Sequence, residues 1–471
     1  MTALPAGWRE GEIAIIGLAK SGTGAAALLA REGARVYASD SGEPETLGAT
    51  AAELRILGVD VETGGHDLER IARAKLVVAS PGVPPGAPPL AAARDAGVPV
   101  VSEIEVALRL LGNTRIIAVT GTNGKTTTTA LVGHLLRSIG VTAIDAGNIG
   151  TPLSQVALNE HPSWIALEMS SFQLHDTPGL DPTVGVVTNL SPDHLDRYAG
   201  VDDYYADKAM LFRNASSASR WVLNADDDEV LNLAVRGAAT SGYRPYTQPT
   251  LGKTHLFSLG NRDCEAYYDR NREALVVLGD VLLDRKDLAL FGDHNVANAL
   301  AASLAVMIAD PDYAAVEARE RIAGGLRSFR ALKHRLEVAG EYDGVLWIND
   351  SKATNVSSTL VAIQGMTRPT ILLLGGRHKG EPYTALAEPF GRVGKRVIAY
   401  GEAAPIIESD LGSLISVERL GSSFPDVIAR ASEIAESGDA ILLSPACSSY
   451  DMFRNYEERG ADFKRLATGK A

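Results

Sequence analysis

Residues 116–129 read IIAVTGTNGKTTTT, a short apolar run followed by a glycine-rich turn. The β-branched run at 116–119 has the length of a buried strand. Gly121 and Gly124 let the backbone turn tightly and expose consecutive N–H groups. Apolar residues then recur at helical spacing up to Gly140, which is typical of a helix end. Strand, loop and helix start predict a phosphate cradle, because the amides and the helix dipole both favour an anion.

The spacing differs from the common P-loop, which places a glycine at the sixth position before its lysine. That position is Val119 here, and the segment that remains is the shorter GTNGKT at 121–126. A glycine turn before a helix can be only a turn. However, the lysine supplies positive charge and Thr126 supplies a hydroxyl suited to a Mg²⁺ shell. A strand, two glycines, a lysine and a threonine in this order and spacing favour an ATP-phosphate site.

The bulk composition sets limits on the class of protein. At 471 residues the chain is too long for one ordinary domain, and about two to four are expected. A net charge of −13 argues against nucleic acid as the general partner. Cys264 and Cys447 match no zinc spacing and predict reduced thiols. No apolar run reaches about 18 residues and no signal-peptide core is found, so we expect a cytoplasmic protein without a membrane span.

The N-terminal region carries a second glycine turn. Residues 12–24 read EIAIIGLAKSGTG, which is similar to a dinucleotide-binding turn, but Ala19 replaces the second glycine of G-x-G-x-x-G. Further apolar stretches at 35–39 and 76–79 also end in polar residues, and the first of them ends at Asp40. An acid about 20 residues after such a turn suits a ribose or base contact. The pattern predicts an open α/β sheet with a ligand at its strand ends, although the glycines could simply close turns.

The same alternation continues along the chain. Apolar stretches at 164–167 and 184–188 precede polar loops, and the region from about 243 to 291 predicts a small antiparallel sheet. After about residue 330 the alternation recurs, with apolar stretches at 345–348, 371–374, 397–400 and 441–443. The predicted fold class is α/β with three domains: an N-terminal Rossmann-like sheet (1–107), a central P-loop ATPase-type α/β sheet with a small antiparallel sheet (108–329) and a C-terminal Rossmann-like α/β domain (330–471).

Several side chains at strand ends suit metal and anion chemistry. Glu168 and the pair Asp193-His194 could bind Mg²⁺ beside ATP, because hard cations prefer oxygen ligands. Acids near helix starts are often only caps, and His194 alone could be a structural histidine. Lys208, in the helical stretch DDYYADKAML, is interpreted from the residues alone as a surface lysine.

The C-terminal region gathers cations in its polar loops. Three cations lie in or beside these loops. Arg335 and Lys352 are near Asp350 in the sequence, and Lys379 follows the apolar stretch 371–374. A single exposed lysine usually has no special role, but several at strand ends predict a grip on a carboxylate or phosphate.

Seven segments resemble the motifs of the Mur ligases. They read GTNGKTT, LEMSSFQL, SPDHLDRY, GDHNVANALAA, HRLE, NDSKATN and SPACSSYDMFRNYEERG, and they extend over nearly the whole chain. The resemblance implies a ligase of peptidoglycan precursor synthesis. In such an enzyme ATP phosphorylates the alanyl carboxylate of UDP-N-acetylmuramoyl-L-alanine, and the amine of D-glutamate attacks the acyl phosphate, giving ADP and phosphate. The Asp-Asn-Pro-Arg motif of the diaminopimelate- or lysine-adding members is not found, and residues 375–380 read GGRHKG.

The resemblance also implies residue roles, matched by position. Catalytic roles fall on Lys125, Glu168, His194 and Lys208. Contacts to ATP fall on Gly121, Thr122, Asn123, Gly124, Lys125, Thr126, Thr127, Asn295, Asn298, Arg335, Asp350 and Lys352. Two Mg²⁺ ions are implied, with metal contacts from Thr126, Glu168, His194 and Lys208, the last as a lysine carbamylated by CO₂. The residues implied to bind the UDP-sugar are Gly17, Leu18, Ser21, Gly22, Asp40, Ser41, Gly82, Asn148 and His194. Those implied to bind glutamate are Thr354, Lys379, Ser449 and Tyr456.

Some positions depart from the family pattern, and two other functions stay open. The family often has Thr-Arg after the acid at Asp40, whereas this chain has Ser41-Gly42, which puts a cation contact to uracil in doubt. Tyr450 and Tyr456 replace other side chains, so the glutamate pocket can differ in shape. A folyl-polyglutamate-type ligase is one alternative, and a P-loop switch that uses ATP as a conformational signal is another. We expect a monomer that binds small molecules and no nucleic acid.

Overall fold

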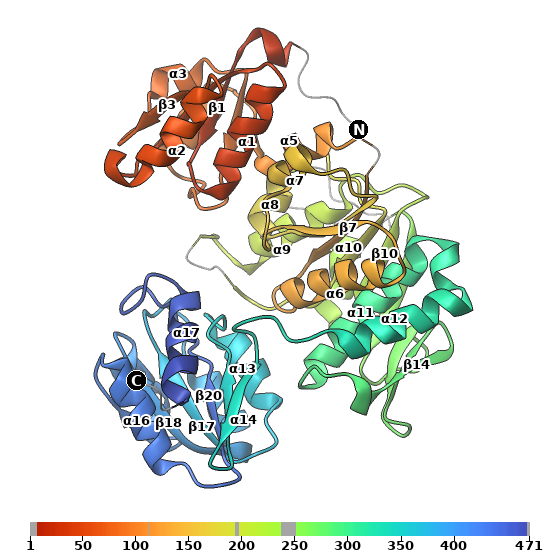
Figure 1. Cartoon of the computed structure of the whole chain (residues 1–471), viewed down its shortest axis with the longest axis vertical. Helices are drawn as coiled ribbons and strands as arrows, with labels where there is room; N and C mark the ends of the chain where they lie inside the picture. Colours follow the sequence, from red (N-terminus) through yellow and green to blue (C-terminus); the bar gives the residue numbers. More distant parts are fainter. Residues whose placement is uncertain (1–6, 113, 194–196, 237–250, 469–471) are drawn as a thin grey trace. The chain divides into compact units, whose positions relative to one another are not determined.

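A computed structural model describes residues 7–112, 114–193, 197–236 and 251–468 (Figure 1). Within these residues the chain builds three sheets of five, nine and six strands in succession. The predicted α/β class with three successive sheets is confirmed. The chain divides into two compact units, Met1–Asp284 with Asn298–Leu326, and Arg285–Ala297 with Arg327–Ala471.

The N-terminal sheet is parallel, with strand order β3-β2-β1-β4-β5. Its strands are β1 (Glu12–Ile16), β2 (Arg35–Asp40), β3 (Asp60–Thr63), β4 (Leu76–Ala79) and β5 (Val100–Ser102). Alternate residues of β1 face opposite layers. Ile13 and Ile15 pack with α1 (Lys20–Arg31) and α2 (Pro44–Ile56), whereas Ala14 and Ile16 pack with α3 (Leu68–Ala72) and α4 (Pro88–Asp95). Burial on both faces explains why Ile13 to Ile16 are all apolar.

The central sheet has strand order β14-β13-β12-β11-β10-β9-β6-β8-β7. Its strands are β6 (Arg115–Thr120), β7 (Ala143–Gly147), β8 (Trp164–Glu168), β9 (Val184–Val187), β10 (Arg220–Asn224), β11 (Lys253–Ser258), β12 (Ala266–Asp269), β13 (Ala274–Val277) and β14 (Asp280–Asp284). Strands β6 to β11 run parallel, whereas β13 pairs antiparallel with both β12 and β14. The predicted antiparallel part is thus an extension of the central sheet, joined to it by parallel pairing of β11 with β12.

The helices that follow β6 in the chain, up to residue 328, are α6 (Lys125–Ser138), α7 (Leu153–Asn159), α8 (Ser171–His175), α9 (Val201–Ala209), α10 (Asp228–Arg236), α11 (Asp293–Ala309) and α12 (Val316–Ser328), with 3₁₀ turns η2 (Met210–Phe212), η3 (Arg285–Asp287) and η4 (Pro311–Ala314). A further 3₁₀ turn, η1 (Trp8–Glu10), precedes β1 of the N-terminal sheet. The division between the two compact units falls inside α11. Because the β6 and β8 neighbours are parallel, the loops after these strands lie at one edge of the sheet.

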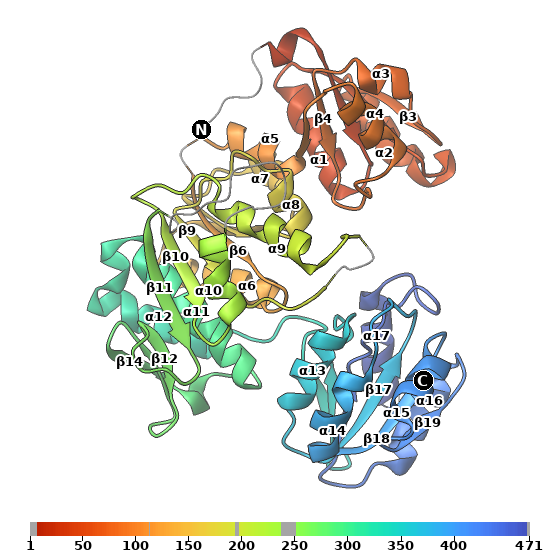
Figure 2. The ribbon, with the colours of Figure 1, turned by 180° about the vertical axis from the view of Figure 1, so that it is seen from behind.

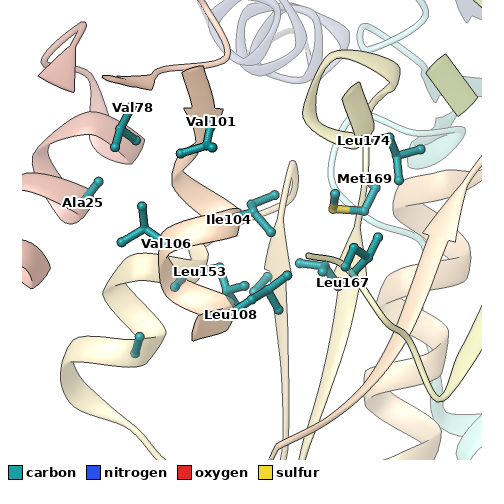
Figure 3. Close-up of a cluster of buried hydrophobic side chains, with 14 of the residues drawn as sticks. Ala25, Val78, Val101, Ile104, Val106, Leu108, Leu153, Leu167, Met169 and Leu174 are labelled. Carbon is teal, nitrogen blue, oxygen red and sulfur yellow. The ribbon is translucent and has the colours of Figure 1, made fainter. Parts of the chain in front are cut away.

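The N-terminal and central sheets share one hydrophobic core through helix α5 (Glu103–Leu110). Figure 3 shows Ile104, Val106 and Leu108 of α5 between Ala25 and Val78 on one side and Leu167 and Met169 on the other. Polar contacts reinforce this junction. The Ser102 N–H donates to Asp176 O at 2.7 Å, and Glu105 accepts from Gly179 N–H at 2.8 Å. The segment that links the two sheets is therefore a packed helix.

The C-terminal sheet has order β15-β16-β20-β17-β18-β19. Figures 1 and 2 show it from opposite sides, with β17 and β18 labelled in both. Its elements are β15 (Glu337–Tyr342), β16 (Val345–Asn349), α13 (Val356–Gln364), β17 (Thr370–Gly375), η5 (Thr384–Leu386), α14 (Ala387–Val393), β18 (Gly394–Tyr400), α15 (Ala404–Leu411), β19 (Val417–Arg419), α16 (Phe424–Ile434), β20 (Ala440–Leu443) and α17 (Tyr456–Ala467). Leu372 and Leu374 pack with α13 to α15, and Ile371 and Leu373 pack with α16 and α17. Helices thus cover both faces.

Candidate active site

The loop between β6 and α6 needs its glycines. Gly121 has φ +138° and Gly124, the N-cap of α6, has φ +80°, values that favour glycine. Neither position has room for a side chain. A Cβ on Gly121 would lie 2.1 Å from Thr188 Oγ1, and one on Gly124 would lie 2.5 Å from Asn298 Oδ1. The loop therefore runs in close contact with its neighbours and delivers the start of α6 to the sheet edge.

Lys125 folds back over this loop. Its Nζ donates to Gly121 O at 2.9 Å and to Thr122 O at 2.6 Å. Thr126 and Thr127 are buried in the first turn of α6. The first N–H groups of a helix have no acceptor within the helix, so this end suits an anion. The loop thus combines a cation, helix-start amides and hydroxyls.

Glu168 ends strand β8 and is buried. Its Oε1 accepts a 2.9 Å hydrogen bond from Asn148 Nδ2, just beyond β7. Its Oε2 is buried and has no hydrogen-bond partner among the described residues. A buried acceptor without a donor is costly unless a cation or ligand meets it. The donor chemistry therefore fits a hard cation such as Mg²⁺. Among the described residues, no group of three His, Cys, Asp or Glu could hold a metal ion by itself.

Lys208 is buried at 1% exposure, so its interpretation as a surface lysine is wrong. Helix α9 turns Tyr204 and Lys208, four residues apart, to the same side. The Lys208 Nζ donates to Gly121 O at 2.7 Å and lies 4.6 Å from the Tyr204 ring centre. Burial, and next the charge of Lys125, lower the pKa of the Lys208 ammonium well below its usual range. His194, which is also expected to contact metal and the UDP-sugar, lies outside the described residues.

A cleft of about 760 Å³ lies in the first unit. Six of the residues expected at the UDP-sugar line it: Gly17, Ser21, Asp40, Ser41, Gly82 and Asn148. Leu18 and Gly22 are not among its lining residues. The Leu18 N–H donates to Asp40 Oδ2 at 2.6 Å, and Gly42 N–H donates to Asp40 Oδ1 at 2.7 Å. Each Asp40 oxygen thus fixes the turn and keeps a further lone pair for a ligand.

Sequence reasoning missed other cleft residues. His66, Ser80 and Gln173 also line the cleft, and Ser39 Oγ lies 2.9 Å from His66 Nδ1. Gln173 stands in the LEMSSFQL segment, so its motif could have indicated it. His66 follows the short strand β3 and belongs to no motif, so only the fold brings it to the cleft.

In the second unit, Asp350 follows strand β16 and is buried. Its carboxylate accepts from Ser444 Oγ at 2.8 Å and from Leu336 N–H at 3.2 Å. Burial raises the pKa of Asp350 to about 7, although the Ser444 bond and the charge of Arg335 oppose the rise. Nearby, Lys352 Nζ lies 5.6 Å from the ring centre of Tyr456, the first residue of α17. Asn295 belongs to this unit, whereas Asn298 belongs to the first.

The expected glutamate residues come from three loops of this unit and from the start of α17. Lys379 Nζ donates to Thr354 Oγ1 at 3.3 Å. Arg377 and Ser448 exchange backbone hydrogen bonds of 2.9 and 3.2 Å, which joins the Lys379 loop to the loop of Ser449. The buried Arg459, which sequence reasoning missed, donates to Ser351 O at 2.8 Å and Cys447 O at 3.1 Å. It belongs to the last resembling segment, which was the available signal.

Three family profiles match successive parts of the chain. "Mur ligase MurD-like, N-terminal domain" matches residues 11–102, "Mur ligase middle domain" matches 119–306, and "Mur ligase, glutamate ligase domain" matches 334–447. Relatives match almost end to end. A protein of Anaeromyxobacter dehalogenans (strain 2CP-C) named UDP-N-acetylmuramoylalanine--D-glutamate ligase is 42% identical over 478 residues, covering 98% of each chain. A protein of the same name from Salinibacter ruber is 40% identical, covering 97% of this chain and 98% of its own.

Solved structures share the fold at low identity. A UDP-N-acetylmuramate-alanine ligase from Thermotoga maritima gives a TM-score of 0.60 at 19% identity, covering 98% of this chain and all of that one. A MurF ligase from the same organism, in complex with ADP, gives 0.59 at 15% identity, covering 93% and 96%. Three domain matches in order, with full-length relatives at 40% identity and above, establish that this chain belongs to the Mur ligase family.

Proposed function

We propose that the chain is an ATP-dependent ligase that joins D-glutamate to UDP-N-acetylmuramoyl-L-alanine in peptidoglycan precursor synthesis. One observation carries the proposal. Asn148 lines the 760 Å³ cleft and also holds Glu168, whose strand β8 lies directly beside the phosphate-loop strand β6. A substrate in the cleft would therefore extend toward nucleotide phosphate. The name shared by relatives at 42% and 40% identity supports the same activity.

In the first step the alanyl carboxylate attacks the γ-phosphorus of ATP, and ADP leaves. A carboxylate is a poor electrophile, so its conversion to an acyl phosphate supplies a good leaving group. The phosphate loop, Gly121 to Thr127, would bind the phosphates with Lys125 released from its own loop carbonyls. Catalysis here is mainly positioning and charge neutralisation.

Thr126, Glu168 and a carbamylated Lys208 would hold Mg²⁺, together with His194. A bound Mg²⁺ neutralises phosphate charge and orients the oxygens. The buried, unpaired Oε2 of Glu168 supports this assignment. The low pKa of Lys208 supports its modification, because only a neutral amine reacts with CO₂. Phosphate oxygens and water would complete the shell.

In the second step the amine of glutamate attacks the acyl carbon. A tetrahedral intermediate forms, phosphate leaves, and the nitrogen gives up its proton. Thr354, Lys379, Ser449 and Tyr456 would receive glutamate, with the Lys379 ammonium opposite one of its carboxylates. Arg335, Asp350 and Lys352 would contact ATP from the C-terminal domain, and Asn295 and Asn298 would lie at its adenine side.

The three sheets suggest three functional domains: residues 1–107 for the UDP-sugar, 108–329 for ATP and 330–471 for the amino acid. We expect the enzyme to act as a monomer in the cytoplasm, where ATP and nucleotide sugars are available. Among the helices in the described part of the chain, none combines the length and apolar character needed to cross a membrane.

The test is an acceptor screen. Phosphate release from ATP is measured with UDP-N-acetylmuramoyl-L-alanine and each amino acid, both enantiomers included, and with folate in place of the sugar nucleotide. We expect release only when the UDP-sugar and D-glutamate are both present. Lys379→Ala should raise the KM for glutamate, while Arg392→Ala, at an exposed ion pair with Glu388, should not. Full ATP turnover without either acceptor would refute the ligase, and turnover with folate would favour the polyglutamate alternative.

A further inference from the structure

In the loop after β9, the side chain of Asn189 hydrogen-bonds to the backbone of the phosphate loop. Its Oδ1 accepts from the Asn123 N–H at 2.8 Å, and its Nδ2 donates to the Asn123 carbonyl at 3.0 Å. The Asn189 carbonyl also accepts from Thr122 N–H at 2.8 Å. A carboxamide presents a donor and an acceptor side by side, so it satisfies both backbone groups of one residue. No assigned role so far uses this contact.

Further hydrogen bonds from the same loop hold Thr122 and Asn123 of the phosphate loop in place. Thr188 Oγ1 donates to the Asn123 carbonyl at 2.6 Å. The Thr122 hydroxyl donates to Ser191 O at 3.0 Å and accepts from Ser191 N–H at 3.0 Å. The segment so held lies between Gly121 and Gly124, both at positive φ. Glycine loops lose more conformational freedom on ordering than other segments, so external bonds are needed to hold one geometry.

This pairing decides which amides can meet a phosphate. The Asn123 N–H is directed to Asn189 rather than to a ligand. The backbone part of the cradle then begins near Gly124, the N-cap of α6. The orientation of those amides follows from the Asn123 peptide that precedes them.

We propose that Asn189 is a positioning residue for the ATP phosphate site, which holds the Asn123 peptide so that the first turn of α6 is pre-organised for phosphate. This role rests on the proposed ATP-dependent function. It assigns Asn189 no contact with ATP itself. Pre-organisation lowers the ordering cost of binding, so loss of these hydrogen bonds appears as weaker nucleotide affinity.

The sharpest variant is Asn189→Asp, which is isosteric and keeps an acceptor for the Asn123 N–H. When ionised it places an acceptor against the Asn123 carbonyl in place of the donor. We expect the KM for ATP and the Kd for Mg-ADP to rise about tenfold, with the KM for the UDP-sugar nearly unchanged. Asn189→Ala serves as the second variant. Hydrogen exchange of a peptide covering residues 120–128 should become faster in Asn189→Ala, because the Asn123 N–H loses its acceptor.

The matched control is Asn214→Asp. Asn214 Nδ2 also donates to backbone carbonyls, of Pro178 at 2.9 Å and Leu180 at 2.8 Å, in the same unit but away from the loop. The Asn214→Asp variant should leave nucleotide affinity and hydrogen exchange of residues 120–128 unchanged. An unchanged Kd for Mg-ADP in both Asn189 variants, with wild-type binding intact, would overturn the positioning role. Failure of the wild-type chain to bind Mg-ATP or Mg-ADP would instead overturn the ATP site, and this role with it.

Discussion

The side-chain amide of Asn148 donates a 2.9 Å hydrogen bond to Oε1 of Glu168, and its backbone N–H donates to the Glu168 carbonyl at 3.0 Å. Asn148 also lines the cleft of the first unit. One residue therefore touches both the cleft and the buried carboxylate. Its amide holds one carboxylate oxygen and leaves the other, Oε2, as an acceptor without a partner among the described residues.

Asn148→Ala should weaken the response to Mg²⁺, because the amide that orients Glu168 is lost. Partners that orient metal ligands are worth about 10- to 100-fold in affinity or activity, so we expect a shift of that order in the Mg²⁺ concentration for half-maximal activity. The KM for the UDP-sugar should rise as well. Asn159→Ala, which removes an exposed amide bonded to Gln155 O, is the control. An unchanged Mg²⁺ curve in Asn148→Ala would contradict the orienting role.

Lys208→Ala should lower activity by on the order of 100-fold or more, if a carbamate on this lysine binds metal. The lowered pKa of the buried amine favours its neutral form, which can take up CO₂, and acidification should reverse the modification. Labelled CO₂ should give a carbamate signal in the wild-type protein that disappears in Lys208→Ala. Short carboxylates should restore part of the lost activity.

Lys253→Ala is the control for this lysine, because Lys253 is exposed on β11. It should keep both the carbamate signal and the rate. Wild-type rates in protein freed of CO₂ would rule out the modification, even if Lys208→Ala were inactive for another reason.

Gly22→Ala should damage the cleft. A Cβ there would lie 1.8 Å from Gly17 O and 2.6 Å from Ser80 Oγ, so the turn must shift. We expect a loss of about 1–3 kcal/mol in the free energy of unfolding, or a higher KM for the UDP-sugar if the strain is relieved locally. Gly48→Ala, in the exposed middle of α2 with nothing within 4 Å of its Cβ, should stabilise by about 0.5–1 kcal/mol. Urea unfolding measures both, and equal effects would contradict the steric argument.

Asp350 should make the stability of the chain depend on pH. Burial raises its pKa in the folded state to about 7, whereas an unfolded aspartate titrates at about 3.9. The folded state therefore binds the proton more tightly, and this contribution is full below about pH 4 and lost as the pH rises through about 7. Asp350→Asn should flatten the fall in the unfolding midpoint between about pH 4 and 7, and exposed Asp426→Asn should not. Parallel curves for wild type and Asp350→Asn would disprove the assignment.

Much of the fold could be predicted because its signals are local. The apolar runs at β1, β6, β8, β9 and β16 to β18 are buried on both faces, so each stands out from the polar loop that follows it. The short strands β3, β5 and β19 could not be predicted, because a segment of three or four residues, such as DVET in β3, is too short to show hydrophobic periodicity. Strand β15 was missed as well, since its mostly half-exposed residues show no apolar run.

The residues of the candidate site could be predicted from the sequence only in part. The phosphate loop could be recognised, since glycine conformations and a helix start depend on neighbours in the sequence. The burial of Lys208 could not, because an isolated lysine in a helix carries no sign of what packs on it. The resemblance to Mur ligases indicated a role for Lys208, but not the carbonyl that holds it.

By itself, then, the sequence determined the α/β class, the glycine loop with its lysine, and the chemistry offered at each strand end. The tertiary structure alone decided which of these ends meet. The order β9-β6-β8-β7 brings Asn189 to Asn123 and Asn148 to Glu168, although these partners lie 66 and 20 residues apart in the chain. Local preferences cannot encode such pairs, because they depend on which parallel strands become neighbours, and that is settled by packing over the whole sheet.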